Sequence, residues 1–545
     1  MIADSLVPGA PQRRGCFPSP RYALALVGVL AAALGVRLYV LAHTENIARD
    51  GVLYLHMGRQ FTQRSAAEVI QQTDYHPGYA ATVMALSQWG GATWPDGWVQ
   101  VGQWVSILMS LAALAALYYV ACAAFDPPIA LVTVLLMALS GSYTRTSCDV
   151  ISDSMCLAMV LLSVAFALAA MRRVRRRSGW AAALAGASGL SAGAGYLTRP
   201  EGILGAGAAV LLLLLPRRLG ARGRAIQAAA VAALAVAVLV CVLPYAHAIG
   251  GFTQKKTLAD FVLSAGDGPM LAAASGPTDA WEAFRRGLDR LRAGVGTPVA
   301  VLVLITAGTW LARTVPRLGV PRSVVAIPSR EGAVAMFLPA ILMIPLVMLL
   351  EYKQPVRYIS SRHMLIPAFL LTPLAGAAVV SLAQWTLCLA DRLHLRRIPG
   401  LAIGGWVATL VIVMSFDALP ILHKGKGCYR QAGLAIRRRF GSGALVLTDD
   451  SRVALFAAAP GEQFLRSTVM PSSLHQGDAP SFETFLRQVN RTCRGSGYAV
   501  IAVSARFLAR VGDRDLLSRL PDEKFEPIAT FQSGRKDKVW LLRRR

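Results

Sequence analysis

The chain has 545 residues, of which 55% are hydrophobic and 16% charged, and its formal net charge is +26. A chain this apolar cannot hide its hydrophobic surface in one soluble core, so the composition predicts an α-helical protein that crosses the membrane many times. The basic residues lie in short segments between apolar runs and not on one soluble face, which argues against nucleic acid and favours membrane lipids as partners.

Apolar runs long enough to cross the membrane follow one another through most of the chain. About eleven of them approach the length needed to cross ~30 Å of hydrocarbon. Those at 128–142 and 203–215 are short for complete crossings. The predicted spans are 22–42, 102–124, 128–142, 150–171, 179–196, 203–215, 226–249, 297–312, 332–350, 364–388 and 400–421.

Arginine clusters between these runs set the expected orientation. With eleven spans all five clusters fall on the same side, which the positive-inside bias makes cytoplasmic. The sequence therefore predicts a multi-pass protein of the plasma (inner) membrane. Its expected parts are a cytoplasmic segment at 1–21, a transmembrane domain at 22–421 with an exterior loop at 43–101, and an extracytoplasmic domain at 422–545. The clusters lie at 13–21, 172–177, 217–224, 313–330 and 392–397.

The exterior loop begins with a short polar stretch. Asp50 and Tyr54 follow the first span closely, and His76 precedes Pro77 later in the loop. Residues 46–63 read as an amphipathic helix with Tyr54 on its apolar side, so we expect this helix to lie in the membrane interface.

Two further exterior turns carry charged residues. Asp149 and Asp153 are four apart, which on a helix would put both carboxylates on one face. Pro200 and Gly202 are expected to end one helix and start the next, fixing Arg199 and Glu201 at the surface. The exterior segment before the tenth span is also polar, with Lys353, Arg357, Tyr358 and Arg362.

The last 120 or so residues have a different pattern. Runs at 444–447, 498–503, 526–531 and 539–542 read as strands, and 481–492 and 506–520 read as helices. This mixture predicts a small C-terminal α/β domain.

Taken together, several of these elements resemble those of one family. They are the Asp-Gly followed by Tyr after the first span, the later His-Pro, the Leu-Thr-Arg-Pro-Glu turn at 197–201, and the Arg-Tyr at 357–358 before a late span. Over about residues 20–420 the chain resembles the GT-C glycosyltransferases. It is most similar to the bacterial lipid-linked-sugar transferases related to protein O-mannosyltransferases and to the lipid A aminoarabinose transferase.

This resemblance implies an inverting transfer of a sugar from a polyprenyl-phosphate donor to an extracytoplasmic glycan, lipid or protein. It makes Asp50 the candidate base or metal ligand, and Asp149 or Asp153 a second acid. The family often has Asp-Glu where this chain has Asp50-Gly51, so a divalent cation is left open.

Basic and hydroxyl side chains on the same side supply the remaining candidates. Arginine forks bind phosphate bidentately, so they suit a phosphate leaving group. The expected donor-phosphate contacts are Tyr54, Arg199, Lys353, Arg357 and Arg362, and the expected substrate-positioning residues are His76, Glu201 and Tyr358.

Other interpretations of the same residues remain open. A transporter or flippase of lipid-linked glycans favours charges or broken helices at the bilayer midplane, whereas this chain keeps its charges at one side. A catalytically inactive scaffold is a third possibility. Arg199 can also simply pair with Glu201, and the acids near residue 150 can cap a helix.

Overall fold

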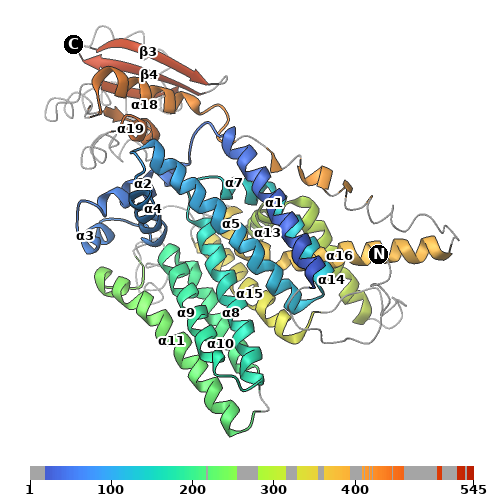
Figure 1. Cartoon of the computed structure of the whole chain (residues 1–545). Helices are drawn as coiled ribbons and strands as arrows, with labels where there is room; N and C mark the ends of the chain where they lie inside the picture. Colours follow the sequence, from blue (N-terminus) through green and yellow to red (C-terminus); the bar gives the residue numbers. More distant parts are fainter. Residues whose placement is uncertain are drawn as a thin grey trace.

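The computed structural model describes residues 19–216, 219–253, 280–314, 328–353 and 361–392, parts of 405–419, most of 422–458, and residues 500–505, 525–533 and 537–544. Most of the described residues are helical, and a small sheet lies near the C-terminus (Figure 1).

Five helical segments in these ranges are long and apolar enough to cross a membrane. They are α1 (Pro20–Ala42), α5 (Asp96–Ala124), α8 (Asp153–Arg175), α11 (Ala221–Ile249) and Arg362–Leu387, most of which is α16 (Leu365–Arg392). Two bent pairs raise the number to seven if each is one span. These are α6 (Pro127–Ala138) with α7 (Gly141–Ser147), bent by 66°, and α13 (Ala280–Val295) with α14 (Thr297–Thr314), bent by 111°. A multi-pass membrane protein is thus confirmed.

The predicted number of eleven spans is not settled by these helices. Three further helices coincide with predicted spans but are not among those that meet the length and hydropathy criterion: α9 (Trp180–Thr198), α10 (Leu204–Leu214) and α15 (Arg330–Lys353). The run at 400–421 lies largely outside the described residues. The number eleven therefore stays a prediction.

Helix α9 shows why hydropathy alone undercounts spans. It is rich in Gly, Ala and Ser, which lowers its hydropathy but lets neighbouring backbones approach closely. The Ser188 hydroxyl donates to the Ser163 carbonyl of α8 at 2.8 Å. On its α11 side, a Cβ added at Gly189 would lie 2.3 Å from the Leu234 carbonyl oxygen. Small residues therefore hold α9 tightly between two helices that do meet the criterion.

The helices run between two distinct ends of the bundle. At one end, Arg175 of α8 pairs with Glu331 of α15 at 2.5 Å, and the Ser329 amide donates to the Ala124 carbonyl of α5 at 2.8 Å. We call this the arginine end. The opposite ends of α8 and α9 carry Asp153 and Arg199, and we call that the site end.

The loop between α1 and α5 folds over the site end as three short helices: α2 (Arg49–Gln60), α3 (Ala66–Gln71) and α4 (Gly78–Trp89). Helix α2 lies within the expected amphipathic segment, but it is buried on most sides, with Val52, Leu55 and Met57 all at 2% exposure or less. The apolar side of α2 packs against other parts of the protein, and the location of this helix in the membrane interface stays a prediction.

The C-terminal residues place a four-stranded sheet beyond the site end (Figure 1). Its strands β1 (Val446–Thr448), β2 (Val500–Ser504), β3 (Phe525–Ser533) and β4 (Asp537–Arg544) lie in the order β1-β2-β4-β3. The β1–β2 pair is parallel and the other two pairs are antiparallel. Helices α18 (Gly427–Phe440) and α19 (Ser451–Phe456) accompany it.

Each of the four strands expected from the sequence overlaps one of these strands. The two helices expected at 481–492 and 506–520 lie outside the described residues. The division into a transmembrane domain and a separate α/β domain at 421/422 stays a prediction.

Candidate active site

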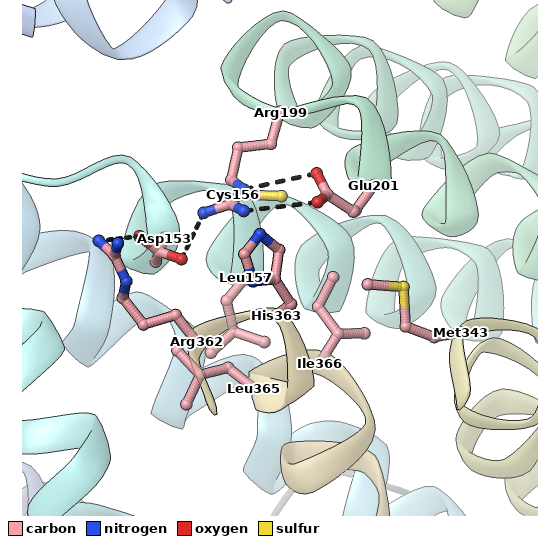
Figure 2. Close-up of a pocket in the computed structure, with 10 residues that line it drawn as sticks. All are labelled: Asp153, Cys156, Leu157, Arg199, Glu201, Met343, Arg362, His363, Leu365 and Ile366. Carbon is pink, nitrogen blue, oxygen red and sulfur yellow. Dashed lines mark hydrogen bonds and ion pairs between the residues drawn. The ribbon is translucent and has the colours of Figure 1, made fainter. Parts of the chain in front are cut away.

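A cavity of about 180 Å³ opens at the site end between the first-loop helices and the ends of α8, α9 and α16. Most of its polar lining comes from residues singled out in the sequence. It is lined by Asp50, Tyr54, Tyr75, His76, Ile151, Asp153, Thr198, Arg199, Arg362 and His363. A smaller pocket of about 20 Å³ shares four of these residues and adds Glu201 together with apolar side chains (Figure 2).

The turn after α9 aims Arg199 at this cavity. The helix ends at Thr198, Pro200 starts a short 3-10 helix (η2, Pro200–Ile203), and the extended backbone of Arg199 joins them. A Cβ at Gly202 would lie 2.1 Å from the Gly195 carbonyl carbon, so only glycine fits this close approach. The end of one helix and the start of the next were expected here.

Arg199 is held between two carboxylates (Figure 2). Its guanidinium forms an ion pair with Asp153 and lies 3.4 Å from both carboxylate oxygens of Glu201. Arg199 and Glu201 were expected at the surface, but their side chains are only 13% and 15% exposed. Burial acts to lower the pKa of Arg199, but the two carboxylates outweigh it and hold that pKa well above its ordinary value.

A second guanidinium connects Asp50 with Asp153. Arg362 donates from Nη2 to Asp50 Oδ2 at 2.9 Å, and its Nη1 lies 3.9 Å from Asp153 Oδ2. Asp153 is 5% exposed, whereas Asp50 is 38% exposed. The site therefore pairs one buried carboxylate with one that an incoming molecule can reach.

Tyr54 and His76 complete the polar wall of the cavity. The Tyr54 hydroxyl lies 2.7 Å from Ser152 Oγ, and burial raises the pKa of Tyr54 above its ordinary value. His76 Nδ1 lies 2.7 Å from the Tyr196 carbonyl oxygen, which can only accept, so Nδ1 carries the proton. Its Nε2 lies 3.2 Å from the Thr253 hydroxyl oxygen.

Asp149 has a different location from the one expected. Helix α8 begins at Asp153, so Asp149 lies in the preceding turn and the two acids do not share a helical face. Asp149 Oδ1 accepts from the Ala48 and Val150 amides at 2.9 and 2.8 Å, and its Oδ2 lies 2.7 Å from His423 Nε2. It is not among the residues that line the two pockets described here.

Three expected site residues cannot be placed, and two residues that were not expected line the cavity. Arg357 and Tyr358 lie outside the described residues, as does the side chain of Lys353 at the end of α15. Tyr75 and His363 line the cavity but were not singled out. The sequence could have indicated them only by position, because each is next in the chain to an expected site residue, His76 or Arg362.

The donor set of this cavity suits an anionic group better than a metal ion. Among the described residues, no three His, Cys, Asp or Glu side chains are grouped so that they could hold a metal. Asp50 and Asp153 face guanidinium groups instead. A Cβ at Gly51, next to Asp50, would lie 2.6 Å from the Val150 carbonyl oxygen. The close packing of α2 on the turn before α8 thus excludes a side chain there.

Part of the chain matches a known protein family. Residues 97–245, from α5 to α11, match the family model described as dolichyl-phosphate-mannose-protein mannosyltransferase. No curated protein matches the sequence.

Two solved structures are similar over most of the chain. The oligosaccharyltransferase of Archaeoglobus fulgidus, in complex with Zn and sulfate, has a TM-score of 0.55 and 13% identity, covering 90% of this chain and 70% of that one. ArnT from Cupriavidus metallidurans, bound to undecaprenyl phosphate, has a TM-score of 0.54 and 14% identity, covering 94% of this chain and 97% of that one. These findings confirm the resemblance seen in the sequence: the chain has the fold of the GT-C membrane glycosyltransferases.

Proposed function

We propose that this protein is an integral-membrane inverting glycosyltransferase that moves a sugar from a polyprenyl-phosphate donor to an extracytoplasmic glycan, lipid or protein. The observation that carries the proposal is the joint presence of Asp50, Asp153, Arg199 and Arg362 around one cavity. The matched family model is described by a dolichyl-phosphate-linked mannose donor, and one similar structure holds undecaprenyl phosphate. Both point to a lipid-linked donor.

In the proposed reaction Asp50 is the general base. Its carboxylate takes the proton of an acceptor hydroxyl, whose oxygen forms the new bond to the anomeric carbon from the face opposite the phosphate. The bond between that carbon and the phosphate oxygen breaks, and its electron pair leaves with the phosphate. A positioned base typically contributes about 10²–10⁴-fold to such a step, and the 38% exposure of Asp50 leaves room for the acceptor.

The proposed role of the arginines is to stabilise the leaving phosphate. Arg199 and Arg362 present fixed forks of N–H donors at the cavity, and such forks match phosphate oxygens. Asp153 pairs with both guanidinium groups and so orients them, which favours Asp153 over Asp149 as the second acid of the site. Tyr54, His76 and Glu201 are proposed to hold the donor and these partners in place. Lys353, Arg357 and Tyr358 are kept as further candidate substrate contacts.

The replacement Asp50→Asn tests the proposal because it removes the proton acceptor at nearly constant volume. We expect transfer from a purified polyprenyl-phosphate sugar to fall by about 10²–10⁴-fold while thermal unfolding in detergent is unchanged. Asp96→Asn is the matched control, because Asp96 is 40% exposed, also pairs with arginine, and does not line the cavity.

Two results would contradict the proposal. Retention of more than about a tenth of the activity in Asp50→Asn lies outside the usual loss of a general base and would remove Asp50 from that role. Turnover of the corresponding nucleotide sugar, with no lipid carrier present, would exclude the lipid-linked donor.

A further inference from the structure

The segment just before Asp50 is tied to the C-terminal part of the chain by backbone contacts. Glu45 Oε2 accepts from the Gly425 and Gly427 amides at 2.9 and 3.2 Å. Asn46 Nδ2 donates to the Lys426 carbonyl at 2.9 Å. Two successive residues are thus held by one turn that lies some 380 positions away in the sequence.

Arg49, the residue next to Asp50, is held by a buried carboxylate. Its Nη2 and Nε donate to Asp450 Oδ2 at 2.8 and 3.2 Å. Asp450 is 1% exposed and also receives Arg452 Nη2 and Nε at 2.6 and 2.8 Å. Burial acts to raise the pKa of Asp450, but the two arginines outweigh it and lower that pKa, so Asp450 is ionised at neutral pH. Because Asp450 also caps α19, its position is fixed.

A third link lies between these two. The Ala48 amide donates to Asp149, whose other oxygen lies 2.7 Å from His423 Nε2. His423 belongs to the same turn that holds Glu45 and Asn46. Four of the five residues at 45–49 therefore contact the C-terminal part directly or through Asp149.

We infer that this set of contacts, which we call the 45–49 clamp, makes the C-terminal part of the chain a positioning element for Asp50. Among the described residues Arg362 is the one side chain bonded to Asp50, so the location of its carboxylate depends on the backbone that precedes it. The clamp fixes that backbone as α2 begins. The expected effect on kcat rests on the proposed function. The restraint of the backbone at residues 45–55 does not depend on it.

Replacing Arg49 with Gln removes the ion pair that holds the last residue of the clamp, without leaving a buried charge unpaired, because Asp450 keeps Arg452. Arg49 is 52% exposed, so the fold should tolerate the change. Arg430→Gln is the matched control. Arg430 is 45% exposed and pairs at 3.1 Å with Asp96, so it joins the same two parts of the chain away from Asp50.

Two measurements on the full chain in detergent test the inference. In Arg49→Gln we expect faster amide hydrogen exchange over residues 45–55 and a kcat lowered by roughly 10- to 100-fold, the scale of a misplaced catalytic group, with the donor KM unchanged. Arg49→Lys should recover part of the kcat, and Arg430→Gln should match the wild type in both measurements.

Unchanged exchange in Arg49→Gln would overturn the inference, and so would faster exchange with an unchanged kcat or an equal loss of kcat in Arg430→Gln. Because the exchange measurement needs no substrate, it judges the clamp separately from the proposed function. Absence of any sugar transfer by the wild type would instead count against that function.

Discussion

Arg199 illustrates how one side chain serves structure and chemistry together. Its guanidinium lies between Asp153 and Glu201, and it is only 13% exposed. A buried carboxylate that loses its cation is costly, because the charge has already given up its hydration. The same guanidinium faces the cavity, where a phosphate would compete for its donors.

Replacing Arg199 with Ala should therefore affect both stability and donor binding. We expect a loss of about 3 kcal/mol, the low end for breaking a buried pair, because Asp153 keeps Arg362 at 3.9 Å. Arg199→Lys keeps the charge but not the fork, so it should restore much of the thermal stability and little of the donor affinity. The melting temperature and the donor KM of the two variants measure this. Normal donor KM in Arg199→Lys would mean that Arg199 only balances its neighbouring carboxylates.

At this scale the sequence indicated the types of residue but not their partners. Asp50, Arg199 and Arg362 stand out because they lie in the predicted exterior segments, on the side away from the five arginine clusters. The Asp50–Arg362 contact joins residues 312 positions apart, and no local pattern reports such a contact. The prediction that Asp149 and Asp153 share a helical face was wrong. A spacing of four residues means a shared face only inside a helix, and α8 begins after Asp149.

At the scale of elements, the amphipathic pattern of α2 corresponds to packing against other protein segments. An apolar face beside a membrane span reads as an interfacial helix, but here α19, α4 and the turn before α8 cover it. The covering segments include residues about 400 positions later in the chain, so the pattern alone cannot separate a lipid surface from a protein surface. What it does predict correctly is the helix and the apolar side that carries Tyr54.

The replacement Gly51→Ala tests how closely α2 must approach that turn. The added Cβ would lie 2.6 Å from the Val150 carbonyl oxygen, which is backbone and cannot rotate away. Alanine favours the helix by roughly 1 kcal/mol over glycine, while overpacking costs typically about 1–3 kcal/mol. We therefore expect a lower melting temperature and reduced transfer, because both Asp50 and Asp153 adjoin this contact. A melting temperature at or above the wild-type value would show that α2 has room to move. Gly207→Ala is a control, since nothing lies within 4 Å of a Cβ there.

At the scale of the whole molecule, the two ends of the bundle differ in charge. The last turn of α8 and the two residues after it carry five arginines between Arg172 and Arg177, and the start of α15 carries Arg330, all at the arginine end. The acids and arginines that line the cavity lie at the site end. Runs of about 20 apolar residues made the long spans and α9 predictable, whereas composition did not indicate the 66° bend between α6 and α7.

This asymmetry predicts that the site end and the C-terminal residues are extracytoplasmic. Short loops rich in Arg and Lys remain in the cytoplasm during insertion, so the arginine end should face inward. Alkaline phosphatase fused after Leu422 should be active and a fluorescent protein at the same point dark, while fusions after Arg177 should show the reverse. The Arg177 fusions serve as the internal control for expression. Active phosphatase after Arg177 together with silence after Leu422 would place the cavity in the cytoplasm, where nucleotide sugars are plentiful. The argument for a lipid-linked donor would then lose its topological basis, even though the geometry around Asp50 and Arg199 would be unchanged.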